Sequence, residues 1–350
     1  MTIAAESLKT IPICYASCSI GYKPSHTLVK KLDAIAAAGF SAIELSFPDL
    51  HSFAEEFMGR DVDPSDYNAL CAAGGQVKKL CAERNLDIPL LQPFANFEGW
   101  PRGSPERKAA FDRAAGWIRI MEAVGSNMLQ VGSSDSPHIT SSRDDLAGDI
   151  RELADLLAPH QFRLAYENWC WATHCPDWKD VWHIVQKVDR PNVGLCLDTF
   201  QSAGGEWADP TTASGLREDL PGGRAAVESA FQRSLDELSA TIPKDKIFFL
   251  QISDAYKPRQ PFDPQPDENG LRPRGRWSHD FRPLPYDGGY LPVVAFTKAV
   301  LNTGFRGYFS TEIFDSGPDG TGQTYEDLHG IAHKAAKAHQ RLLADCVDER

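Results

Sequence analysis

The sequence predicts an α/β fold, a single (β/α)8 TIM barrel over residues 1–350 with long loops after the sixth and seventh strands. Three observations support this prediction. Short aliphatic runs alternate eight times with helical patterns, and the 350 residues exceed the ~250 that such a barrel usually needs. The first strand is followed by residues 18–24, which lack the glycine-rich phosphate turn typical of a doubly wound sheet.

The strands are predicted from short runs of β-branched and aliphatic residues, each followed by a longer amphipathic segment. This order is the pattern of parallel strands joined by helices. The eight runs are residues 12–20, 41–47, 87–94, 127–132, 162–169, 192–200, 246–253 and 307–314.

The helices are predicted from apolar residues that recur every three or four positions and from residues that mark helix ends. Ser104 and Pro105 are typical of a helix start, and Gly39 and Gly125 of a helix end. The helices are residues 27–38, 66–84, 104–125, 142–158, 177–188, 225–240, 292–303 and 325–346.

Two segments exceed ordinary loop length: residues 201–224 after the sixth strand and 255–290 after the seventh. In a barrel both emerge at the C-terminal ends of the strands, where binding and catalytic residues gather. We therefore expect functional side chains in both segments.

Charge and composition exclude several classes of protein. The net charge of −12, from 36 basic and 48 acidic residues, argues against a nucleic-acid partner. Apolar runs do not reach the ~20 residues of a membrane span, and the first residues lack a signal-peptide core. The sequence predicts a cytoplasmic protein with reduced, mostly buried cysteines and no membrane partner. It leaves open whether the chain forms a homo-oligomer.

Polar residues end four consecutive strands that should otherwise be apolar: Glu167, Asp198, Gln251 and Glu312. Three carboxylates at one barrel mouth would repel each other unless a cation joined them. Any single acid is better explained by a rim arginine or lysine. The set of four favours a divalent metal site, and its oxygen donors suit Mg²⁺ or Mn²⁺, with Co²⁺ as a substitute.

Other side chains near the strand ends are candidates for the same mouth. His174 follows Glu167 by seven residues and is a candidate general acid or base. Glu44 ends the second strand and either reaches the mouth or meets a rim base. An anion site is suggested by His279 together with Arg272, Arg274, Arg276 and Arg282. An aromatic rim that excludes water is suggested by Trp100, Trp169, Trp171 and Trp207.

With these residues the chain resembles the xylose isomerase-like barrel superfamily, and within it most closely the 3-dehydroshikimate dehydratases. The four strand ends resemble the metal-binding strands of that superfamily. The matching stretches cover most of the barrel and are residues 91–99, 166–174, 194–200, 250–254 and 277–282.

The resemblance implies a metal-dependent lyase that dehydrates 3-dehydroshikimate to protocatechuate through a metal-stabilised enolate, in quinate and shikimate catabolism. It implies Mg²⁺, Mn²⁺ or Co²⁺ as cofactor and a small cyclic hydroxy-ketone as substrate. In this reading Arg282 contacts the substrate carboxylate and His174 transfers the proton. The remaining expected substrate contacts are Glu44, Gln92, Gln201 and His279.

Two positions depart from the dehydratase pattern. Ala95 stands where an arginine follows Gln-Pro-Phe, and Gln201 stands where a histidine follows the metal aspartate by three residues. These departures keep a sugar isomerase or epimerase, or an inosose dehydratase, open as alternatives on the same metal site. A three-zinc endonuclease of this barrel type is disfavoured by the acidic charge and the oxygen-rich site. A barrel that only binds a metabolite would differ from all of these by lacking metal-dependent turnover.

Overall fold

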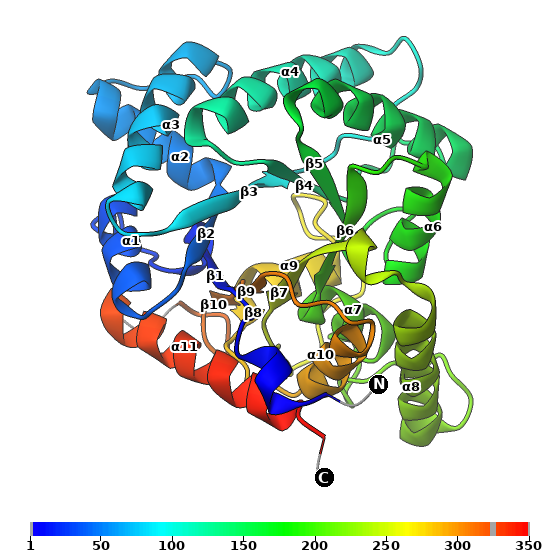
Figure 1. Cartoon of the computed structure of the whole chain (residues 1–350). Coiled ribbons are helices and arrows are strands. Elements are labelled where there is room, and N and C mark those ends of the chain that lie inside the picture. Colours follow the sequence, from blue (N-terminus) through cyan, green and yellow to red (C-terminus); the bar gives the residue numbers. More distant parts are fainter. Residues whose placement is uncertain (1–2, 323–326, 349–350) are drawn as a thin grey trace.

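The computed structural model describes residues 3–322 and 327–348 of the chain. Eight parallel strands close into a barrel in the order β1-β2-β3-β4-β5-β6-β7-β9. Figure 1 looks into this barrel and shows the helices arranged around it. The predicted (β/α)8 fold is confirmed.

Each predicted apolar run contains one strand of the barrel. The first run is too long, because residues after Ala16 turn into a short 3-10 helix, Ser17–Ser19. The strands are β1 Ile13–Ala16, β2 Ala42–Ser46, β3 Asp87–Phe94, β4 Met128–Gly132, β5 Arg163–Glu167, β6 Val193–Asp198, β7 Ile247–Ile252 and β9 Phe309–Thr311.

The eight predicted helices are also present, and their sequence end signals operate as expected. The Ser104 and Ser142 side chains cap their helices by accepting from Arg107 N and Asp145 N. Part of the predicted last helix, residues 325–326, lies outside the described residues. The helices are α1 Leu28–Ala37, α3 Tyr67–Ala82, α4 Pro105–Val124, α5 Arg143–Leu157, α6 Trp178–Val188, α8 Gly223–Thr241, α10 Val293–Asn302 and α11 Leu328–Asp345.

Three further helices lie in segments for which the sequence predicted no helix. In α2, Phe47–Met58, Ser46 caps the first turn and proline follows, but Phe47 resembles a strand residue. In α7, Thr199–Glu206, two glycines weaken the helical pattern. In α9, Pro273–Asp280, the charged residues lack an apolar stripe. The long segments after the sixth and seventh strands are present as predicted, and each contains a short helix, α7 or α9, that the sequence did not indicate.

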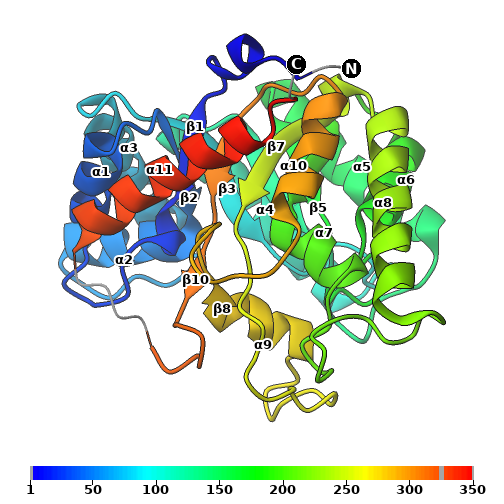
Figure 2. The ribbon, with the colours of Figure 1, turned by 90° about the horizontal axis from the view of Figure 1, so that it is seen from below.

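The segment after β7 covers the C-terminal ends of the strands. Within it, β8 Phe281–Arg282 pairs antiparallel with β10 Phe314–Asp315, a strand that follows β9. Figure 2 shows α9 and β8 at one end of the molecule and both chain termini at the other. The predicted long loop thus lies over the barrel mouth, where the polar strand ends converge.

Two further expectations from the sequence concern membrane-spanning helices and the state of the cysteines. Within residues 3–322 and 327–348, we find no helix with the length and apolar character that a membrane span requires. All eight cysteines are free, as predicted, and six of them are buried. The cytoplasmic location stays a prediction.

Candidate active site

Three carboxylates meet at the C-terminal end of the barrel. Glu167 ends β5, Asp198 ends β6, and Glu312 directly follows β9. One oxygen of each lies within 4.8 Å of the others, and the residues are only 2%, 0% and 6% exposed. The parallel strands bring them together because their C-terminal ends share one end of the barrel.

Arg282 supplies positive charge to this cluster. Its Nη2 donates to Asp198 Oδ2 at 2.5 Å and to Glu312 Oε2 at 3.0 Å, and its Nε donates to Ser253 Oγ at 2.9 Å. Burial disfavours the charged guanidinium, but the two acids outweigh this and raise the pKa of Arg282 above its usual value. The ion-pair alternative considered from the sequence therefore holds for two of the three acids.

The remaining negative charge is not relieved by this one arginine. Burial raises the pKa of Glu167 well above its usual value, and the nearby Asp198 raises it further. Burial also raises the pKa of Glu312 despite the contact with Arg282. The pKa of the adjacent buried Glu44 rises to about 7, again mainly because of burial. Several buried carboxylates close together repel one another in their charged form, and a bound cation would relieve this repulsion.

The oxygen atoms of this cluster fit a divalent cation. Among the described residues, Glu167 Oε1 and Glu44 Oε1 are buried without a hydrogen-bond partner. A buried polar atom without a partner costs roughly 1–3 kcal/mol, and a cation would satisfy it. Carboxylate oxygens are the donors preferred by hard divalent cations. The buried acidic triad can hold a metal ion.

Gln251 contacts the carboxylate cluster, but its side-chain oxygen does not face the carboxylates as expected of a metal ligand. Its Nε2 donates to Glu44 Oε2 at 2.8 Å and to Glu312 Oε1 at 2.9 Å, while its Oε1 accepts from Cys196 Sγ at 3.2 Å. The nitrogen rather than the predicted oxygen therefore faces the carboxylates. To serve as a ligand, the amide has to rotate by about half a turn.

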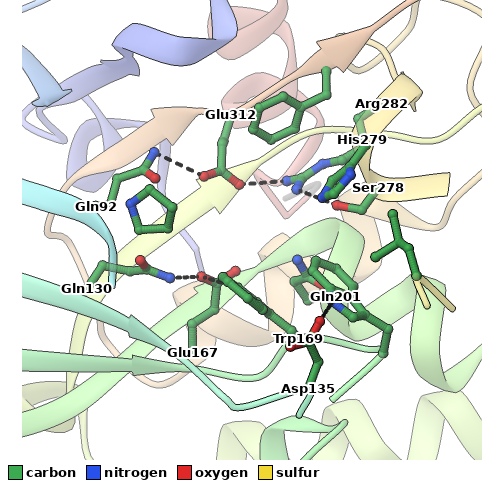
Figure 3. A pocket seen from close by; sticks show the side chains of 14 residues that line it. Gln92, Gln130, Asp135, Glu167, Trp169, Gln201, Ser278, His279, Arg282 and Glu312 are labelled. Carbon is green, nitrogen blue, oxygen red and sulfur yellow. Dashed lines mark hydrogen bonds and ion pairs between the residues drawn. The ribbon is translucent and has the colours of Figure 1, made fainter. Parts of the chain in front are cut away.

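A cavity of about 220 Å³ opens over the carboxylates (Figure 3). Gln92, Glu167, Gln201, His279, Arg282 and Glu312 line it, as the sequence analysis expected of residues at the mouth. Further lining residues that the sequence analysis did not single out are Pro93, Gln130, Asp135, Leu271, Ser278 and Phe314. The polar floor and partly apolar walls suit a small polar ring compound.

Two of the predicted catalytic and substrate-binding residues, Glu44 and His174, lie away from the lining. Glu44 is fully buried beside Gln251. His174 is half-buried, and its Nε2 lies 3.4 Å from the carbonyl oxygen of Ile139 rather than in the cavity. Closeness in sequence to Glu167 does not bring His174 to the cavity, although Trp169 and Trp171, which lie between the two residues in sequence, both line it. The catalytic role of His174 stays a prediction.

His279 is the histidine that lines the cavity. Its ring lies 6.1 Å from that of Trp171 in an edge-on arrangement. Burial lowers its pKa below the usual value, although Asp280, Asp135 and Asp267 act in the opposite direction. No hydrogen bond to the ring is found among residues 3–322 and 327–348, so both nitrogens are available to a ligand.

Arg272, which precedes α9, and Arg274 and Arg276 within it do not form the anion site suggested by their spacing. Arg272 donates to the carbonyl of Trp171 at 2.6 Å, and Arg276 donates to that of Asp263 at 2.6 Å. Arg274 donates to two carbonyls at the end of α7, those of Gly204 and Ala208. These arginines hold the loops together. Within the predicted cluster, Arg282 and His279 alone line the cavity.

Half of the predicted aromatic rim is present. Trp169 and Trp171 stack with ring centroids 5.0 Å apart and line one wall of the cavity. Trp100 instead donates to the carbonyl of Asn96, and Trp207 packs against Tyr290. Loop packing explains the latter two.

Gln130, a residue of β4 that contacts Glu167, was not predicted from the sequence as a site residue. Gln130 Nε2 and Trp169 Nε1 both donate to Glu167 Oε2, the latter at 3.3 Å. A signal was present, since Gln130 interrupts the apolar run of β4 as Glu167 interrupts that of β5.

Comparison with known proteins places the chain in a class. The family model described as xylose isomerase-like TIM barrel matches residues 32–343, and the chain belongs to this family. A solved fusion protein, described as xylose isomerase-like TIM barrel/4-hydroxyphenylpyruvate dioxygenase, superposes with a TM-score of 0.70 at 26% identity. The match covers 95% of this chain and 42% of that protein.

Two more relatives have a specific name. A protein of Neurospora crassa named 3-dehydroshikimate dehydratase is 34% identical over 304 residues, which are 83% of this chain and 82% of that protein. A Pseudomonas aeruginosa protein of the same name is 31% identical over 84% of this chain. This chain spans only 37% of the Pseudomonas relative's length.

Proposed function

We propose that the protein is a divalent-metal-dependent dehydratase, a carbon–oxygen lyase that converts 3-dehydroshikimate to protocatechuate. The observation that carries the proposal is the 34% identity to the Neurospora dehydratase along most of both chains. A cavity over a buried carboxylate cluster supports the same reaction class, since dehydration next to a ketone requires stabilisation of developing negative charge.

In this proposal Glu167, Asp198 and Glu312 hold Mg²⁺, Mn²⁺ or Co²⁺, and Gln251 joins them once its amide has rotated. Such a cation, when bound, polarises the ketone of the substrate and makes the neighbouring C–H more acidic. The protein contributes the fixed positions of the ligands and a buried setting for the carboxylates, in which electrostatic effects are strong.

Arg282 and the tryptophan wall account for substrate binding in the proposal. Arg282 lines the cavity, and its Nη1 makes only a long contact of 3.4 Å with Ser278 Oγ, which leaves donor capacity for a substrate carboxylate. Trp169 and Trp171 offer flat apolar surface to the carbon ring. The substrate class that fits both features is a small ring bearing a carboxylate.

We assign the proton transfer to His279, with His174 as the alternative derived from the sequence. His279 lines the same cavity as Glu167, Glu312 and Arg282, whereas His174 faces the Ile139 carbonyl. An imidazole with free nitrogens can remove the proton next to the ketone or protonate the departing hydroxyl.

The test is a product assay. Purified protein is incubated with Mn²⁺ and 3-dehydroshikimate, and the ultraviolet absorbance of protocatechuate is followed over time. A chelator-treated sample and the Glu312→Gln variant serve as controls, and inosose serves as a neutral ring ketone. We expect protocatechuate from the metal-loaded wild type alone. Turnover of inosose without turnover of 3-dehydroshikimate would replace the proposal by the inosose dehydratase alternative.

A further inference from the structure

We propose that Gln130 and Trp169 are positioning residues that hold one oxygen of Glu167 and thereby present its other oxygen to the cation. This inference rests on the proposed metal-dependent function. It concerns the direction in which a ligand points, which the presence of the carboxylate cluster alone does not define.

Glu167 is held by side chains that come from two neighbouring strands. Gln130 projects from β4, and Trp169 lies two residues beyond the end of β5. Their side-chain N–H groups both donate to Glu167 Oε2. Figure 3 shows Gln130 and Trp169 reaching Glu167 from two directions. Two donors on one carboxylate oxygen restrict rotation of the whole carboxylate.

The other oxygen of Glu167 has a contrasting environment. Glu167 Oε1 is buried and makes no hydrogen bond to any described residue. Asp198 and Glu312 each place an oxygen close to this carboxylate. The two oxygens of Glu167 are therefore divided between protein donors on one side and a cation on the other.

Gly132 makes room for this arrangement. A Cβ atom at position 132 would lie 2.2 Å from Cε2 and 2.7 Å from Nε1 of Trp169. Any side chain there would push the indole away from Glu167. Gly132 also pairs with Glu167 in the β4–β5 ladder, so the glycine, the indole and the carboxylate occupy one level of the barrel.

Trp171 provides a matched comparison for Trp169. The two rings stack, but Trp171 Nε1 donates to Asp135 Oδ2 at 3.2 Å and not to Glu167. Replacing either tryptophan by phenylalanine keeps an aromatic ring and removes one N–H donor. Only the change at Trp169 removes a donor from Glu167.

The experiment measures Mn²⁺ affinity by titration calorimetry on the full-length protein, without substrate. We expect Gln130→Met and Trp169→Phe to bind Mn²⁺ about 10- to 100-fold more weakly than wild type, the usual cost of removing a group that orients a metal ligand. Trp171→Phe should bind as wild type does. Gly132→Ala should resemble Trp169→Phe, because it displaces the same indole.

Circular dichroism melting verifies that each variant is folded, and any one of the three substitutions that does fold decides the question. Wild-type affinity in the folded variants would overturn the positioning role while leaving the metal site intact. Loss of affinity in Trp171→Phe equal to that in Trp169→Phe would overturn it too, since packing would then be the cause. Failure of wild type to bind Mn²⁺ would instead overturn the proposed function itself.

Discussion

The inside of the barrel contains two layers of opposite character, built by the same strands. One is an apolar cluster consisting of Cys14, Ala42, Leu90, Met128, Ala165, Cys196, Phe248 and Phe249. In six strands, a residue of this cluster is followed two positions later by a buried polar residue. These polar residues are Glu44, Gln92, Gln130, Glu167, Asp198 and Gln251.

The comparison teaches how one strand supplies both stability and chemistry. Alternate residues of a strand face the same side, so two positions along the chain move a side chain from the closed interior to the mouth. The apolar layer keeps water from the base of the carboxylate cluster. In the polar layer above it, burial raises the pKa values of Glu167 and Glu312. Their charged forms are therefore unfavourable without a partner, and a bound cation would stabilise them.

The largest effect is expected from the polar layer. Chelation should abolish turnover, and Mg²⁺, Mn²⁺ or Co²⁺ should restore it. Glu167→Gln should lower kcat/KM by at least about 10³-fold, because several kcal/mol of charge stabilisation depend on the cation. Its Tm should not fall, since one buried charge is removed. Kinetics with elemental analysis tests this, and full activity in metal-free protein would contradict it.

The next effect separates two histidines that differ in their distance from the polar layer. His279→Ala should lower kcat by about 10²-fold or more while Mn²⁺ remains bound, as expected for loss of a general acid or base. His174→Ala, measured in parallel, should retain most of its kcat. The reverse result would restore the sequence-based assignment to His174.

Substitutions in the apolar layer should lower the stability of the protein and leave its metal affinity nearly unchanged. Met128 is fully buried two residues before Gln130. Met128→Ala should lower the free energy of unfolding by about 2–5 kcal/mol through lost burial and a residual cavity. Mn²⁺ affinity of the folded variant should stay near that of wild type. Urea unfolding with calorimetric titration measures both, and a large loss of affinity would show that the layers are not separable.

A smaller effect is expected for the arginine that serves the polar layer. Arg282→Ala should lower kcat/KM for 3-dehydroshikimate by about 10- to 100-fold, the value of a charge-assisted contact of roughly 1.5–3 kcal/mol. Mn²⁺ affinity should not fall, because a competing positive charge is removed from Asp198 and Glu312. Any activity on inosose should be unaffected. Unchanged turnover of the carboxylate substrate would remove Arg282 from substrate recognition.

The smallest expected effect is a pH dependence of stability caused by His339, a buried histidine outside the barrel. His339 in α11 packs against Phe40, and burial lowers its pKa from 6.5 to about 4. The unfolded chain therefore binds more protons between these values, and stability is lost as the pH falls below 6.5. At pH 5.5 the loss should be about 1.4 kcal/mol. Urea unfolding of wild type and His339→Leu at pH 7.5 and 5.5 tests this, and equal pH dependence would contradict it.

Local patterns in the sequence determined the barrel and most of the carboxylate cluster. Eight alternations of strand and helix without a glycine-rich phosphate turn indicate a closed parallel barrel, and each strand is recognisable from its own apolar run. Glu167, Asp198 and Glu312 were recognisable because a polar residue after buried aliphatic residues is unfavourable without a partner. Strand direction then placed all three at one end.

Only the tertiary structure decided which side chains meet above that cluster. His174 is near Glu167 in sequence, yet His279, which is more than a hundred residues away from Glu167, reaches the cavity. Gln130 and Trp169 converge on one oxygen because two neighbouring strands lie in register, and Gly132 leaves space for the indole. Such contacts depend on loop paths and side-chain directions set by packing of distant segments, which no single stretch of sequence contains.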